Sequence, residues 1–177
     1  MSAGYTTKKF AIHRKVEELL YSLLTGTNRQ IGVYLFGLIN TLPVDLEDEL
    51  FSFDPDRKRR KTFSLDISDL FPQHRDKFEI EVYVVERFLE RYHTGTFLAN
   101  KVFAVKILKL PGYSYRLFFM LDKELHVVVY LHLELRPYEI DDSEWAKEIN
   151  NAMFHYTLVE RQKIINNEDP TGDWTWI

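Results

Sequence analysis

The chain contains no cysteine, and this absence removes several kinds of chemistry at once. Disulfide bonds, thiol nucleophiles and zinc or iron–sulfur sites built on thiolates are all excluded. With 177 residues the chain is long enough to bury roughly 70% of its unfolded surface. A chain of this length needs neither metals nor cross-links to form a core. The lack of cysteine is compatible with a reducing compartment, and we expect a cytoplasmic protein.

The sequence also lacks a long apolar run and an excess of basic residues. No apolar run approaches the ~18 residues of a membrane span, and the N-terminus has no apolar core of a secretion signal. We therefore expect no membrane partner. Lys and Arg number 23 against 27 Asp and Glu, which gives a net charge of −4. Nucleic-acid binding would have to depend on a local patch.

One dense basic cluster occupies residues 57–61 and follows the turn-forming Asp54-Pro55-Asp56. Arg57, Arg59 and Arg60 are candidates for contacting phosphate, and the same cluster is typical of a nuclear-import signal. The alternative is a solvated loop, because acidic neighbours within about 10 Å largely cancel its field. We place a soft boundary at this cluster. It separates an N-terminal helical or mixed extension, 1–60, from an α+β sheet domain, 61–177, unless the two form one compact domain.

The N-terminal extension contains two apolar segments. Residues 8–24 place apolar side chains at helical spacing, and Gly26 is expected to end this helix. Residues 31–42 are apolar but interrupted by Gly32 and Gly37, so periodicity leaves helix and strand equally open. Pro43 is expected to end that segment, whichever it is.

The rest of the chain alternates strands with helices. Alternating patterns at 62–68, 77–82 and 102–110 predict strands, and the spacing from Val84 to Tyr92 predicts a helix. An acidic start at Asp141 and an apolar stripe running to about Ile165 predict a C-terminal helix. The expected fold class is α+β, an antiparallel sheet with a long central hairpin packed against an N-terminal-side helix and a C-terminal helix.

The central hairpin is expected to span residues 113–136. If Leu121 pairs with Leu125 across a short turn, one face of both strands is apolar and Arg116 lies opposite Tyr130. The other face then collects side chains suited to acid–base chemistry or to gripping an anion. They are Arg116, Tyr130, His132, Glu134 and Arg136. The alternative is an ordinary wet face of an antiparallel sheet.

The tail carries Trp174 and Trp176 at strand spacing. Two interpretations follow from this pair. The indoles either dock on the chain's own core or present a binding tail to a partner.

Four segments together resemble the RelE/HigB-like toxin family, the mRNA-cleaving members of bacterial toxin–antitoxin pairs. They are a strand leading into a helix at 77–92, a strand pair at 103–121, a long central strand at 125–137 and a closing helix at 144–156. The resemblance implies a small α/β domain on an antiparallel sheet, with RNA on the exposed sheet face and an antitoxin covering it. It further implies that Arg116 takes the place of the family's sheet arginine, with His132 and Arg136 at central-strand functional positions.

The sequence departs from that family in two respects. The lysine pair that usually follows the central strand is replaced by Glu134-Leu135-Arg136, and the chain is acidic. We therefore favour a non-enzymatic binding or regulatory protein that engages a protein partner on this scaffold. The alternative is an RNA-cleaving toxin acting through Arg116, His132 and Arg136.

A third hypothesis is a metal-dependent nuclease. It would require Asp122 and Glu134 to converge on Mg²⁺, yet some 30 Å of extended strand separates them at about 3.3 Å per residue. No cofactor or metal site is predicted.

Overall fold

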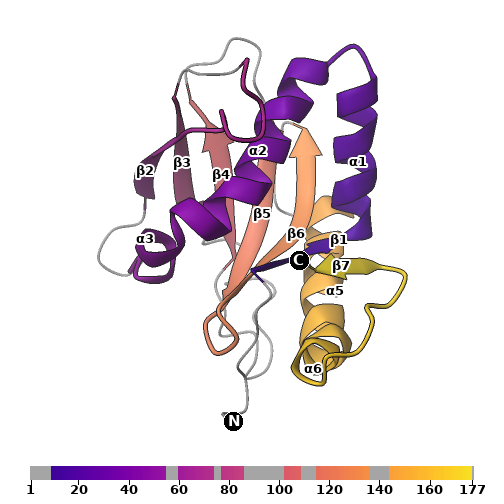
Figure 1. Cartoon of the computed structure of the whole chain (residues 1–177). Helices are drawn as coiled ribbons and strands as arrows, with labels where there is room; N and C mark the ends of the chain where they lie inside the picture. The colour runs from indigo at the N-terminus through magenta and orange to yellow at the C-terminus, as the bar shows by residue number, and fades with distance from the viewer. Residues whose placement is uncertain are drawn as a thin grey trace.

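The protein is organised around a 7-stranded sheet with the order β2-β3-β4-β5-β6-β1-β7 (Figure 1). A computed structural model describes residues 9–54, 60–73, 77–85, 102–108, 115–135 and 144–176. Strand β1 runs parallel to β6, and the other neighbouring pairs are antiparallel. The strands are β1 (Phe10–His13), β2 (Arg60–Leu65), β3 (Phe78–Val84), β4 (Phe103–Ile107), β5 (Tyr115–Asp122), β6 (Val127–Leu135) and β7 (Trp174–Trp176). The α+β class expected from the sequence is confirmed.

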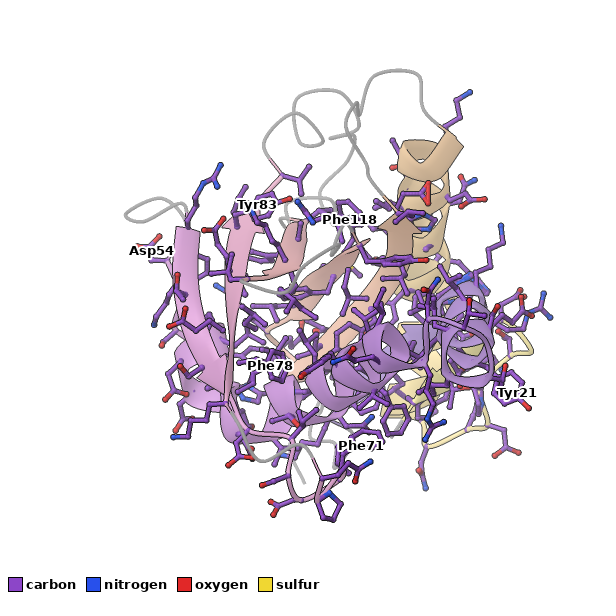
Figure 2. All side chains as sticks on the ribbon, turned by 90° about the horizontal axis from the view of Figure 1, so that it is seen from above. Tyr21, Asp54, Phe71, Phe78, Tyr83 and Phe118 are labelled. Carbon is purple, nitrogen blue, oxygen red and sulfur yellow. The ribbon has the colours of Figure 1, made fainter. Side chains whose placement is uncertain are left out.

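Helices pack on both faces of the sheet. One face, called here the α2 face, is covered by α1 (Arg14–Thr25), α2 (Arg29–Asp45) and α3 (Glu47–Phe51). The opposite face, called the α5 face, packs against α5 (Glu144–His155), a π-helical turn (Tyr156–Glu160) and α6 (Arg161–Ile165). Figure 2 shows Phe78 on the side of α2, and Tyr83 and Phe118 on the other side of the strands. The described residues include no helix long and apolar enough to cross a membrane.

The N-terminal segment belongs to the sheet itself. Strand β1 lies between β6 and β7, where Ala11 pairs with Val129 on one side and with Trp176 on the other. The helix predicted from residue 8 therefore begins later, at Arg14. The His13 side chain accepts a hydrogen bond from the Lys15 amide and caps the start of that helix. Phe10 and Ile12 belong to the α2-face core, together with side chains of α1.

The apolar segment with two glycines is part of helix α2, and its close packing leaves no room for a side chain at either glycine. A Cβ on Gly37 would lie 2.5 Å from Cγ2 of Ile67, and one on Gly32 would lie 2.9 Å from the Leu24 amide nitrogen. The expectation that Pro43 ends the segment was wrong, since α2 continues to Asp45. Proline has no N–H, so the carbonyl of Ile39 loses its helical partner. Tyr130 of β6 replaces that partner and donates its hydroxyl to this carbonyl at 2.9 Å.

The strands predicted at 62–68, 77–82 and 102–110 are present as β2, β3 and β4, with shifted ends. The helix predicted from Val84 to Tyr92 lies mostly outside the described residues, and Val84 itself is the last residue of β3. The C-terminal helix is present and extends through α6 to Ile165, as expected. A π-helical turn at 156–160 interrupts it.

The predicted hairpin register was wrong. Asp122 pairs with Val127, so the turn takes in residues 123–126 and Leu121 faces Val128. A bulge follows, because Phe118 pairs with His132 while Phe119 pairs with Tyr130, which leaves Leu131 as an extra residue on β6. A bulge of this kind turns two consecutive side chains to one face of a sheet. Arg116 consequently lies opposite Glu134 and not opposite Tyr130.

Candidate functional site

The candidate site was expected on one mixed face of the hairpin, and the structure divides its members between two faces. Tyr130 is fully buried in the α2-face core, where its ring meets Phe10 edge-on. Burial raises the pKa of its hydroxyl well above the usual range. Its hydroxyl bonds to the carbonyl of Ile39. Tyr130 was predicted as a binding residue, and this prediction is corrected, because the side chain is enclosed by the protein's own core.

His132 and Glu134 lie on the α5 face, beyond the bulge in β6. Nε2 of His132 is 3.6 Å from a carboxylate oxygen of Glu134, and Nδ1 is 3.5 Å from a carboxylate oxygen of Glu148 on α5. Lys15 of α1 reaches the other oxygen of Glu148 at 3.1 Å. These four side chains, called here the His132 cluster, join β6 to α5 and α1.

Burial shifts the pKa values of two members of the His132 cluster, His132 and Glu134. Only 7% of His132 is exposed, and its Nε2 is buried without a hydrogen-bond partner. Burial lowers the pKa of His132 to about 4, although the nearby Glu148 carboxylate acts in the opposite direction. Burial also raises the pKa of Glu134. The imidazole is therefore neutral at pH 7, and it faces two carboxylates.

Arg116 of β5 reaches the same side of the sheet. Its neighbours Tyr115 and Leu117 belong to the α2-face core, so alternation along the strand turns Arg116 toward the α5 face. It lies opposite Glu134 in the strand register, and its guanidinium also donates to the carbonyl of Tyr115 at 3.1 Å. Arg116, His132 and Glu134 thus lie on the same face of the sheet. Arg136 lies outside the described residues.

A strip of polar side chains continues this face across the outer strands. On β2, Phe63 and Leu65 point into the α2-face core, so Arg60, Thr62 and Ser64 point the opposite way, and all three are exposed. On β3 and β4 the same alternation turns half-buried charged residues to the α5 face. This polar strip consists of Arg60, Thr62, Ser64, Glu79, Glu81 and Lys106. Within it Glu81 lies opposite both Thr62 and Lys106.

The basic cluster contributes one described arginine to this strip. Arg60 donates to a carboxylate oxygen of Glu81 at 2.9 Å, and its guanidinium lies over the ring of Tyr83 at 5.3 Å. The opposing charge on Glu81 matches the alternative in which acidic neighbours offset the cluster. Arg57 and Arg59 lie outside the described residues.

The tail does not present its tryptophans to solvent. Trp174 and Trp176 form β7 and are 2% and 8% exposed within the α5-face core. The indole nitrogen of Trp174 donates to Nδ1 of His155 at 2.9 Å. The interpretation in which the indoles dock on their own core therefore describes the structure. A binding role that needs exposed indoles is corrected accordingly.

The structure also contains a buried carboxylate network that the sequence did not predict. Asp122, at the end of β5, accepts hydrogen bonds from the Tyr156 hydroxyl and from Nε of Arg161, both at 2.8 Å. It also accepts from the amide of Leu125 and so closes the hairpin turn. Nearby, the fully buried Glu160 accepts from the hydroxyl of Thr171. Nothing in the sequence pattern marked the contacts of Asp122 with Tyr156 and Arg161, because they join residues 34 and 39 positions apart in the chain.

The described residues do not include any group of three or more His, Asp and Glu side chains that could hold a metal ion. Asp122 is occupied by Tyr156 and Arg161, so it is not available to pair with Glu134 around Mg²⁺. Comparisons of the chain with protein-family models, with curated proteins and with solved structures each found no match.

Proposed function

We propose that this chain is a non-enzymatic binding protein that engages a protein partner through the polar strip on its α5 face. The observation that carries the proposal is that the described side chains suited to catalysis are either buried or placed opposite a carboxylate. Tyr130 is enclosed, His132 is buried and neutral, and Arg116 stands opposite a carboxylate. None of these three described groups offers an accessible acid, base or unopposed cation.

The charge pattern of the strip supports a protein partner over a polyanion. Within it, Glu79 and Glu81 of β3 lie between Arg60, Thr62 and Ser64 on β2 and Lys106 on β4. Carboxylates interspersed in this way repel phosphate, whereas a protein surface can match both signs. Mixed polar surfaces of this kind are typical of the rims of protein–protein interfaces.

The test is affinity capture from the source cells with matched variants. We expect the wild type to retain one stoichiometric protein and the Thr62→Arg/Ser64→Arg variant to lose it, because both side chains are exposed on β2. The control is Ser22→Arg/Gln30→Arg, which places the same charge on exposed positions of α1 and α2. Circular dichroism checks that all three proteins are folded. Equal capture by the two variants, or no stoichiometric partner for the wild type, would contradict the proposal.

The second candidate is an RNA-cleaving protein of the kind that the RelE/HigB resemblance implies. The observation in its favour is that Arg116 and His132 share one side of the sheet. Expression of the wild type would then arrest growth and cleave messenger RNA, and an Arg116→Ala/Arg136→Ala variant would relieve both effects. Harmless expression and unchanged RNA with both proteins would reject this candidate.

A further inference from the structure

The His132 cluster lies where three elements of the fold meet. His132 and Glu134 come from β6, Glu148 from α5 and Lys15 from α1, and His13 at the end of β1 lies near enough to affect the charge of His132. The bulge in β6 turns His132 toward α5 directly beside Leu131, and the ring of Phe118 lies 6.3 Å away. The cluster therefore joins the N-terminal half of α5 both to the sheet and to α1.

A neutral His132 cannot donate a hydrogen bond to both of the carboxylates that face it. A neutral imidazole has a hydrogen on one nitrogen only, while the other nitrogen presents a lone pair. Because one carboxylate faces each nitrogen, either Glu134 or Glu148 must face that lone pair. One added proton, on His132 or on Glu134, would give the contact between Nε2 and Glu134 the hydrogen that it lacks. This is a chemical reason for the cluster to take up a proton as the pH falls.

Burial sets the pH range of that uptake. It lowers the pKa of His132 to about 4 and raises the pKa of Glu134, so both groups take up protons in the acidic range. Two groups that titrate in the same range at 3.6 Å share a proton as a pair. The other charged groups near the pair are Glu148, Lys15, His13 and, from β5, Arg116. Lys15 and His13 oppose a positive charge on His132, and Glu148 favours it.

We propose that the His132 cluster is an acid-sensitive joint, in which one proton shared by His132 and Glu134 draws Glu148 away from Lys15 and loosens the N-terminal half of α5. At neutral pH Glu148 binds Lys15 at 3.1 Å and so ties α5 to α1. An imidazolium 3.5 Å from the same carboxylate would be a less solvated partner than Lys15, because the His132 side chain is 9% exposed and that of Lys15 is 56% exposed. Moving Glu148 inward removes the tie between the two helices. The charged ring also draws water under the first turns of α5.

Nuclear magnetic resonance of the full-length chain tests this joint. We expect the His132 ring and the Glu134 carboxyl to titrate together in the acidic range, with Glu148 and Lys15 resonances changing at the same midpoint. Glu134→Gln removes the carboxylate that shares the proton, so the His132 midpoint should fall by about one pH unit. Glu168→Gln removes an exposed carboxylate that pairs with Lys163, and it should leave the midpoint unchanged. An unchanged midpoint in Glu134→Gln, or a His132 midpoint near 6.5, would overturn the proposal.

Hydrogen exchange supplies the conformational readout. Amides in the first turns of α5 should exchange about tenfold faster, relative to intrinsic rates, once the proton is bound, which is the factor of one pKa unit of linkage. The same acceleration should be absent in His132→Gln, whose side chain cannot take the proton. Acceleration of equal size in the wild type and in His132→Gln would also overturn the proposal. Because these measurements involve no partner, they do not depend on the proposed function.

Discussion

The two faces of the sheet are packed by different chemistry. On the α2 face the core side chains are apolar, and Tyr130 contributes the buried hydroxyl that serves the Ile39 carbonyl. On the α5 face, ionisable groups are buried within the packing, namely Asp122, His132 and Glu160. Apolar packing depends little on pH, whereas a buried ionisable group needs a partner and a defined protonation state. The α2 face should therefore be stable over a wide pH range, and the α5 face should depend on pH.

The largest expected effect comes from Asp122. Asp122→Ala leaves the Tyr156 hydroxyl and the Arg161 guanidinium without their buried partner. Breaking a buried pair in this way costs about 3–5 kcal/mol of the free energy of unfolding. Glu124→Ala is the matched control, because Glu124 contacts the same arginine at 3.0 Å but is 73% exposed. It should cost less than about 1 kcal/mol in urea denaturation. Similar losses in both variants would remove the distinction between buried and surface pairing on the α5 face.

The second prediction concerns pH. The pKa of His132 is 6.5 in the unfolded chain and about 4 in the folded one, so the folded state binds fewer protons between these values. Stability is unaffected above pH 6.5 and falls as the pH drops toward 4, by about 3 kcal/mol in total at 1.36 kcal/mol per pKa unit. Denaturation at a series of pH values should show this loss in the wild type, and His132→Gln should lack that part of it. If the two proteins show parallel pH profiles, His132 is not the buried neutral group described above.

The third prediction tests the packing of the α2 face. Gly37→Ala places a methyl group 2.5 Å from Cγ2 and 2.9 Å from Cβ of Ile67, and Cβ cannot swing away. Overpacking of this kind should cost about 2 kcal/mol at any pH between 4 and 7. Gly172→Ala is the control, because nothing lies within 4 Å of the added methyl group. A destabilisation by Gly37→Ala that depends on pH would contradict the expectation for this face.

The smallest effect is expected at the hydrogen bond from the Tyr130 hydroxyl to the Ile39 carbonyl on the α2 face. Tyr130→Phe leaves the Ile39 carbonyl buried without a partner and should cost about 1–2 kcal/mol. Pro43→Ala restores a backbone N–H that can bond to the same carbonyl. The cost of Tyr130→Phe should therefore be smaller in the Pro43→Ala background. Additive losses in this double-mutant cycle would show that the hydroxyl does not compensate for the proline.

The sequence predicted where strands and helices lie better than it predicted how the strands pair. Alternation located β2, β3 and β4, and the apolar stripe located the C-terminal helix, because each pattern reports burial on one side. Apolar alternation could not predict the register of β6, because helices cover both faces of the sheet at this strand. Val127 and Val129 belong to one core cluster while Val128 and Tyr130 belong to the other. A strand buried on both sides carries no alternation from which to infer its register.

The candidate site was predicted in part for the same reason. Arg116, His132 and Glu134 share a face as expected, because they lie on the same side of the bulge. Tyr130 lies on the other side of the bulge. A single extra residue in a strand reverses the face to which every side chain before it points. The partners that control His132 were not visible in the sequence. Glu148 and Lys15 come from two helices that only the fold brings together.

The central claim is that the α2 face is stable over this pH range while the α5 face is not, and segment-resolved hydrogen exchange at pH 7 and at about pH 4 tests it most directly. After correction for intrinsic rates, we expect α2 and β4 to keep their protection at the lower pH. The N-terminal half of α5 should lose protection, because His132 then takes up its proton. Equal loss along α2 and α5, or full protection of α5 at the lower pH, would contradict the account.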